Sequence, residues 1–160
     1  MLGNGSIINE YNRMANVGSA YDMDIPSGAK VMDVTGKTII PGLIDSHAHG
    51  SHGTNSLIPQ QNYQNYATLA LGVTTTFNPS SFSPEIFASA EYQRAGLIVG
   101  PRTYSTGEII YGARAGYFND INEYEDALAY VRRLKANGAI GVKNYNQPRR
   151  EQRQMVVAAA

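Results

Sequence analysis

The sequence predicts an α/β fold in which strands alternate with helices around a parallel sheet. Runs with β-prone composition indicate strands at about 38–46, 73–78, 101–106 and 139–145. Apolar residues at helical spacing indicate helices at about 60–71, 84–95, 121–137 and 148–160. Strict alternation of this kind favours right-handed crossovers between parallel strands. A doubly wound sheet and half of an eight-stranded barrel both satisfy this pattern.

The first 37 residues differ from the rest and are predicted to form part of a small β layer. Two β-prone runs occur there, SIINEY at 6–11 and AKVMDV at 29–34. Turn signals separate them at 17–19 and 26–28. The alternating pattern of strands and helices begins only after this layer.

Local signals support the predicted helices and one predicted strand. Ser83 precedes Pro84 and is expected to cap the helix that starts there. The run LGVTTTFN at 71–78 lacks strict alternation, which is typical of a strand buried on both faces. Three glycines follow helical runs and are expected to adopt the left-handed conformation that ends a helix: Gly72, Gly96 and Gly138.

The composition excludes several classes of function. Thirteen basic and thirteen acidic side chains cancel, so no net field attracts nucleic acid or an anionic membrane surface. The chain has no cysteine, and therefore no disulfide or thiolate nucleophile. We find no secretory signal pattern and no run of membrane-spanning length. A soluble protein is expected, and its compartment cannot be assigned.

All three histidines lie within six positions, in the run IIPGLIDSHAHGSHGTNS at 39–56. If the first strand extends this far, His47 and His49 project from the same face, because side chains alternate with period two. Two such imidazoles can bind one divalent cation, and α/β proteins place their sites at the carboxyl ends of parallel strands. Two exposed histidines in a glycine- and serine-rich turn would give the same pattern.

The longer run GKTIIPGLIDSHAHG at 36–50 resembles the signature of the metal-dependent amidohydrolases. The preceding IPSGAKVMDVTGK is similar to the β-layer segment of that family, and IGVKNYNQPRREQRQ at 140–154 resembles the fourth strand and following helix of an imidazolonepropionase-like branch. The resemblance covers essentially the whole chain. It implies the first half of a (β/α)8 barrel over 38–160, preceded by a partial β-sandwich-like layer over 1–37.

The same resemblance implies that His47 and His49 are metal ligands at the end of the first barrel strand. It also implies that Lys143, at the end of the fourth strand, is the lysine that many members carry as a carboxylated bridge between two metals. Burial lowers the pKa of a lysine, and the neutral amine can add carbon dioxide to become an anionic ligand. Zinc is the expected ion, and manganese, iron or nickel would also fit. The implied reaction is hydrolysis of a C–N bond, in a cyclic amide or small peptide, by metal-activated water.

Neighbouring residues have no implied ligand role. His52 is expected to face solvent or the mouth of a pocket, and Asp45 to support the end of the strand rather than act as the catalytic base. Three residues could reach a substrate or could simply connect strand to helix: Tyr145, Asn146 and Gln147. The basic run that opens the last helix opposes the helix dipole. Two explanations of the basic run Arg149, Arg150 and Arg153 remain: a contact with an anion, and a packed salt bridge with Glu151.

The family pattern has further histidine ligands and a general-base aspartate after the lysine, but this sequence has no histidine after His52. We therefore expect a hydrolase fragment that is inactive alone, truncated after the fourth strand and helix and shortened at its start. Open strand edges predict a homo-oligomer or another association that covers them. The alternatives are a non-catalytic half-barrel that at most binds a metal, and a subunit that completes its site with a second chain.

Overall fold

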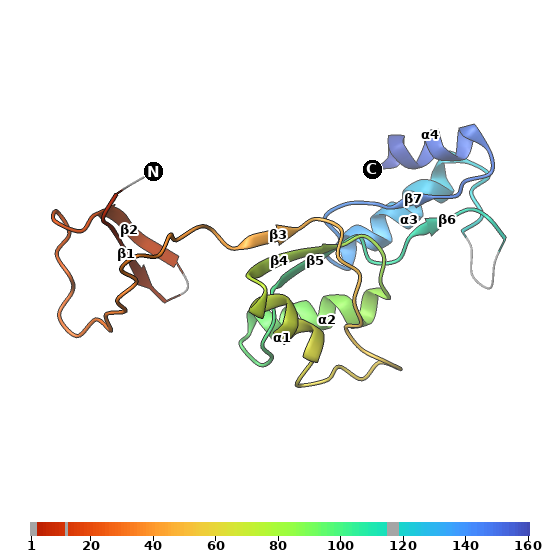
Figure 1. The fold of residues 1–160 in the computed structure, drawn as a ribbon. Helices are drawn as coiled ribbons and strands as arrows, with labels where there is room; N and C mark the ends of the chain where they lie inside the picture. The colour runs from red at the N-terminus through yellow and green to blue at the C-terminus, as the bar shows by residue number, and fades with distance from the viewer. Residues whose placement is uncertain (1–2, 12, 115–118) are drawn as a thin grey trace. The chain divides into compact units, whose positions relative to one another are not determined.

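The computed structural model describes residues 3–11, 13–114 and 119–160. The chain divides into two compact units, Met1–Ile40 and Pro41–Ala160. The first unit contains an antiparallel hairpin of β1 (Gly5–Glu10) and β2 (Arg13–Ser19), shown in Figure 1. A register shift between Ile8 and Asn9 interrupts its ladder.

Two expectations for this first unit are wrong. Residues 17–19 do not form a turn, because they pair with residues 5–7 inside the hairpin ladder. The run at 29–34 is not a strand, and Val31 and Met32 are 68% and 75% exposed. A β-prone run gains nothing from an extended conformation without a neighbouring strand to pair with, and no ladder in the described part of the chain includes this one. The turn at 26–28 is confirmed, since the Ala29 N–H donates to the Pro26 carbonyl.

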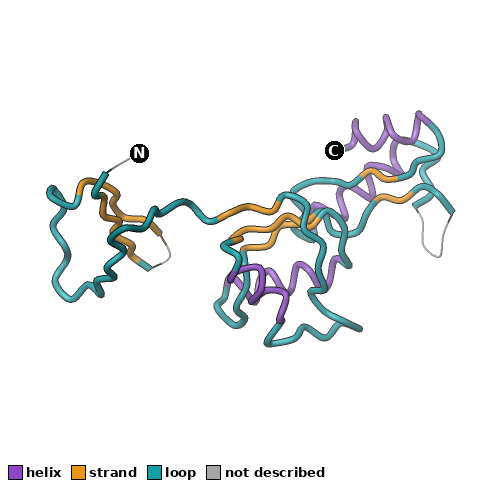
Figure 2. The backbone as a smooth tube through the Cα atoms, viewed as in Figure 1, coloured by secondary structure: helices purple, strands orange, loops and turns teal. Residues whose placement is uncertain are grey.

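Among its described residues, the second unit has four helices and two small parallel sheets (Figure 2). The larger sheet has the order β3-β4-β5, with β3 at Leu43–Asp45, β4 at Val73–Asn78 and β5 at Arg102–Ser105. The smaller sheet pairs β6 (Ile110–Tyr111) with β7 (Asn144–Tyr145). The helices are α1 (Tyr63–Ala70), α2 (Ser83–Arg94), α3 (Tyr124–Ala136) and α4 (Arg150–Ala159). The predicted α/β alternation with parallel pairing is confirmed.

The fourth expected strand, at 139–145, does not extend the larger sheet. A single backbone bond, from the Ile140 N–H to the Ser105 carbonyl at 3.2 Å, links this segment to β5. Further along, the Lys143 carbonyl accepts a hydrogen bond from the Ile110 N–H at 2.9 Å. The segment therefore changes partner from β5 to β6, a short strand that the sequence pattern did not indicate.

One face of the larger sheet is covered. In Figure 1, α1 and α2 lie along the same side of β4 and β5. Thr103 and Ser105 of β5 are buried, whereas Arg102 and Tyr104, which alternate with them, are exposed. The expectation that 71–78 is buried on both faces is wrong, because only Thr76 and Asn78, which share one face of β4, are buried. The main apolar core lies instead around α3 and α4 and is formed by Ile110, Ile121, Ala127, Val131, Leu134 and Val156.

The helix ends follow the sequence signals with one exception. Gly72, Gly96 and Gly138 have φ values of +83°, +74° and +101°, which confirms their left-handed role. Ser83 does not cap α2, because its hydroxyl donates to the Glu108 carboxylate at 2.9 Å. Within the described ranges, no helix has the length and apolar character needed to cross a bilayer.

Gly42 sits at the start of β3, where the chain passes close to Thr74. A Cβ at position 42 would lie 2.8 Å from the Thr74 Cβ and closer still to its hydroxyl and methyl groups. We expect Gly42→Ala to lower the free energy of unfolding by about 1–3 kcal/mol, as overpacking does. Urea unfolding followed by circular dichroism measures this.

Thr74→Ala should recover part of the Gly42→Ala loss, because it removes two of the three clashing atoms. Gly3→Ala is the control, since its added methyl group would meet nothing within 4 Å. Equal stability of Gly42→Ala and Gly3→Ala would contradict the close approach of the two strands.

Candidate functional site

The histidine motif lies just beyond the carboxyl end of β3. The Ala48 N–H donates to the Phe77 carbonyl at 2.9 Å, which keeps the chain beside β4 after β3 has ended. Ser46 and His47 form a turn after β3, and His47 and His49 lie on either side of the anchored Ala48. The Asp45 carboxylate accepts a hydrogen bond from the His47 N–H at 3.0 Å, so it orders the backbone of the motif.

The two imidazoles of the motif converge. The Nε2 atoms of His47 and His49 are 3.2 Å apart, and the ring planes meet at 70°. Two metal–nitrogen bonds of about 2.0–2.1 Å would span this separation at an angle of about 100°, near that of a tetrahedral site. Both rings are solvent-exposed. The separation suits either an N–H···N hydrogen bond between the two rings or two ligands of one divalent cation.

The remaining ligands of such a site are not assembled nearby. In the ranges that the structure describes, no group of three or more His, Cys, Asp or Glu residues could hold a metal. The Lys143 Nζ lies 5.2 Å from the centroid of the Tyr145 ring. Lys143 also precedes β7 instead of ending a strand. Its role as a ligand stays a prediction.

His52 is half-buried and lies against the end of β4. Its Nε2 is 3.4 Å from the Nδ2 of Asn78, whose Oδ1 accepts a hydrogen bond from the Ser80 N–H at 3.0 Å. Because the Asn78 oxygen is occupied in this way, its amide nitrogen donates and the His52 Nε2 accepts. The proton of the neutral His52 ring is therefore on Nδ1.

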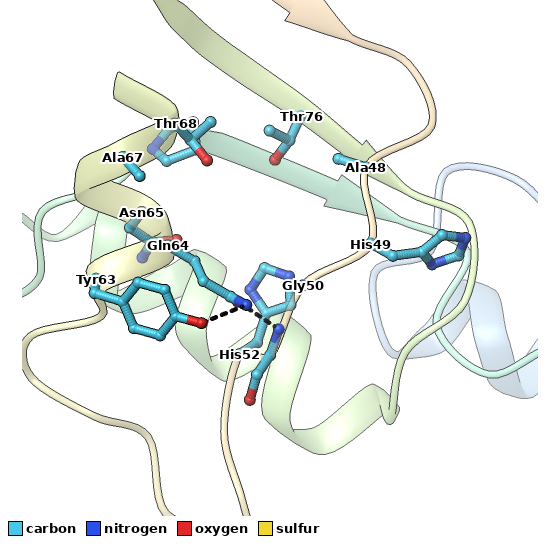
Figure 3. Close-up of a pocket in the computed structure, with 12 residues that line it drawn as sticks. Ala48, His49, Gly50, His52, Tyr63, Gln64, Asn65, Ala67, Thr68 and Thr76 are labelled. Carbon is cyan, nitrogen blue, oxygen red and sulfur yellow. Dashed lines mark hydrogen bonds between the residues drawn. The ribbon is translucent and has the colours of Figure 1, made fainter. Parts of the chain in front are cut away.

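His52 also lines a pocket of about 280 Å³ (Figure 3). The pocket is bounded by the loop from Ala48 to His52, by residues of α1, and by Thr76 and Pro101. The Gln64 side chain bridges the loop and α1, because its Oε1 accepts from the Ser51 N–H at 2.8 Å. Of the two positions expected for His52, the structure favours the one beside a pocket.

The carboxylate of Glu85, on α2, lies near His52. Its Oε1 accepts a hydrogen bond from the Ser56 N–H at 2.9 Å, which ties α2 to the loop that carries His52. Burial lowers the pKa of His52, and the Glu85 carboxylate partly offsets this by raising it. His52 is therefore held as a neutral ring.

The residues after Lys143 form a structural connection. Gln147 is only 4% exposed, and its Nε2 donates to the Ile110 carbonyl at 2.9 Å. Asn146 adopts a left-handed φ of +47°, which turns the chain toward α4. Tyr145 remains 43% exposed and stacks on Tyr111. Of the three residues considered for substrate contact, Gln147 has a structural role, because its buried side chain bonds to the backbone.

The basic run at the start of α4 is explained in part. Arg149 donates to the Ile121 carbonyl at 3.0 Å, and Gln152 donates to the same oxygen. Neither an anion nor a salt bridge with Glu151 is needed, because the backbone supplies an uncharged acceptor. Arg150 and Arg153 are exposed, and the structure gives no functional reason for them.

Three polar residues near the motif escaped the sequence analysis: Asn78, Glu85 and Gln64. Asn78 carried a usable signal, since it ends the run TTTFN and the carboxyl ends of parallel strands meet at one edge. Glu85 and Gln64 lie on helices and carried none, because their partners in the loop are 29 and 13 residues away.

No protein-family model matches the sequence, and no curated protein matches it. Solved structures resemble its fold, among them the following three. A candidate prolidase from Bifidobacterium longum has a TM-score of 0.61 and 26% identity, covering 79% of this chain and 31% of that one. A Xaa-Pro dipeptidase with bound methionine has a TM-score of 0.60 and 18% identity, covering 98% and 49%. An uncharacterized protein has a TM-score of 0.65 and 17% identity, covering 96% and 47%.

Two of these three structures are named as a candidate prolidase and a Xaa-Pro dipeptidase, and this chain resembles their fold. They do not bear on the imidazolonepropionase-like branch. This chain spans between 31% and 49% of the length of the three structures.

His52 should titrate at a lower pH than an ordinary imidazole, whose pKa is 6.5. Glu85→Gln should lower the His52 pKa further, because it removes the charge and keeps an acceptor for the Ser56 N–H. Since the folded pKa is depressed, the stability that neutral His52 contributes is complete above pH 6.5 and is lost as the pH falls through the folded value. Proton NMR of the ring C2–H against pH measures the shift.

Glu151→Gln is the matched control, because Glu151 is exposed on α4. His52→Gln assigns the resonance. An unchanged titration in Glu85→Gln would mean that the two side chains do not interact.

Proposed function

We propose that this chain is part of a metal-dependent hydrolase of amide or peptide C–N bonds, in which His47 and His49 supply the first pair of metal ligands. The observation that carries the proposal is the 3.2 Å separation of their Nε2 atoms beyond the carboxyl end of a parallel strand. The likeness to a candidate prolidase and a Xaa-Pro dipeptidase favours a small peptide over a cyclic amide as substrate.

The chemistry of the donor set suits this role. A zinc ion or similar divalent cation held by His47 and His49 would lower the pKa of a bound water and polarise a carbonyl group. The chain itself holds the two rings in place through the Ala48 backbone bond to β4 and the Asp45 carboxylate. Since a cation at the pair needs further ligands, we include a carboxylated Lys143 among the candidates on the strength of the family resemblance.

The activity and substrates of the whole protein are part of the same proposal, because this chain spans at most about half of the structures that it resembles. The exposed edge of the larger sheet is a reason to propose an additional binding partner. β3 is an edge strand of that sheet, and its apolar residues Leu43 and Ile44 are 50% and 70% exposed. We propose that a second copy of the chain, or further polypeptide, covers this edge and the exposed face.

The first test is the metal content of the purified chain, measured by mass spectrometry. We expect bound metal in the wild type and its loss to background in a His47→Ala/His49→Ala variant, because both imidazoles are then absent. His52→Ala is the matched control, since it removes a histidine that lies outside the pair, and it should keep the metal. A metal content at background in the wild type would contradict the proposal for this chain.

Lys143→Gln extends the same measurement. If a carboxylated Lys143 bridges two ions, this variant should hold less metal per chain than the wild type while His47 and His49 are intact. An unchanged ratio of metal to chain would favour the alternative in which Lys143 does not bind metal and the chain is a metal-binding module. Hydrolysis of a Xaa-Pro dipeptide by any metal-loaded preparation, absent in the His47→Ala/His49→Ala variant, would establish the activity.

Self-association should depend on the exposed edge strand. We expect sedimentation velocity to show oligomers of the wild-type chain and fewer of them for Ile44→Lys, because a buried lysine at the contact would be left unpaired. Val157→Lys on α4 is the control, since Val157 is 72% exposed and lies outside the sheet. A strictly monomeric wild-type chain would contradict the proposal.

A further inference from the structure

The pocket beside the histidine pair has walls of a distinct chemical character. Its described lining contains no Lys, Arg, Asp or Glu, and it offers hydroxyl, amide and imidazole groups instead. Figure 3 shows the ring of His49 directed away from Tyr63, Gln64 and His52. The pocket therefore adjoins the proposed metal pair, and His49 belongs to both, with its ring directed away from the other side chains of the pocket.

Two side chains that line the pocket, His52 and Gln64, have N–H groups that can donate to a ligand. Because Asn78 occupies the Nε2 of His52, the ring proton lies on Nδ1. The Gln64 Oε1 is taken by the Ser51 N–H, which leaves the two protons of its Nε2 to donate, and one contact of that amide with the Tyr63 hydroxyl is long, at 3.4 Å. Groups that donate from a neutral wall pair well with a carbonyl oxygen.

We propose that this pocket is a binding site for a neutral amide, whose carbonyl oxygen accepts hydrogen bonds from the Gln64 side chain and the His52 ring. A carboxylate would enter without a cation to pair with, and an ammonium group without an anion, so both would lose hydration without compensation. A volume of about 280 Å³ suits a small fragment such as one or two peptide units.

The pocket is also preformed. Asn62 donates to the Ser51 carbonyl at 2.7 Å, and Glu85 accepts from the Ser56 N–H, so the loop is fastened to both α1 and α2. A fastened loop loses little conformational entropy when a ligand binds. The role of the pocket as a substrate subsite rests on the proposed hydrolase function, whereas its binding of a neutral amide does not.

The test compares two probes of nearly equal shape, N-acetylglycinamide and N-acetylglycine, at pH 7 in the presence of a chelator. Each is titrated into the isotope-labelled chain, and binding is followed by the backbone amide shifts of Ser51, His52 and Gln64. We expect saturable shifts with the neutral amide and at least about tenfold weaker binding of the carboxylate, because the latter buries an unpaired charge.

Gln64→Glu keeps the acceptor for the Ser51 N–H and removes the donating amide, so it should weaken the neutral amide about tenfold. Gln154→Glu makes the same change at an exposed site on α4 and should bind as the wild type does. Equal binding of the two probes, or wild-type binding by Gln64→Glu, would overturn the assignment.

A His47→Ala variant separates this inference from the proposed function, because His47 is not among the residues that line the pocket. It should lose metal and still bind N-acetylglycinamide, which would support a separate subsite. Loss of amide binding in that variant would show that amide binding depends on the metal pair, and would contradict a separate subsite. If the wild type binds the amide but holds no metal, the hydrolase proposal fails and the pocket stands.

Discussion

The backbone hydrogen bond between Ala48 and Phe77 determines how the candidate site is built. β3 ends at Asp45, yet this bond keeps the chain beside β4 for three more residues. His47 and His49 lie on either side of the anchored Ala48, and their Nε2 atoms are 3.2 Å apart. Without the bond, the backbone between the two rings would lose its link to β4.

The close approach of β3 and β4 makes that bond possible. Gly42 starts the shared segment, and Thr74 fills the space that a side chain there would need. The Leu43 N–H then donates to the Gly72 carbonyl, so the two strands are joined at the start of the segment as well as at its end. The glycine of the IIPGLID run thus acts on the site through strand spacing, seven residues before the second ring of the pair.

Sequence analysis succeeded where the cause is local and failed where a partner is distant. Gly72, Gly96 and Gly138 were recognisable because a left-handed residue ends a helix within its own neighbourhood. Ser83 was misassigned because Glu108, 25 residues later, takes its hydroxyl. The fourth strand changes partner to β6 for the same kind of reason, since pairing depends on a segment that has no strong pattern of its own.

The candidate site divides in the same way. The proximity of His47 and His49 was expected from period-two alternation, but His47 lies in a turn after β3, so the two rings come together by another route. The surroundings of His52 depend on Asn78 and Glu85 from other elements.

The amide of Asn78 carries a consequence for how this loop could change in evolution. Asparagine and aspartate differ by one atom, and with a carboxylate at position 78 the His52 Nε2 would face an acceptor instead of a donor. The ring proton would move to Nε2, the Nδ1 edge would become an acceptor, and the imidazole would bind a proton more readily. A substitution of Asn78 by aspartate would therefore replace a neutral His52 ring at the edge of the pocket with a ring that pairs with a carboxylate and takes up a proton more readily.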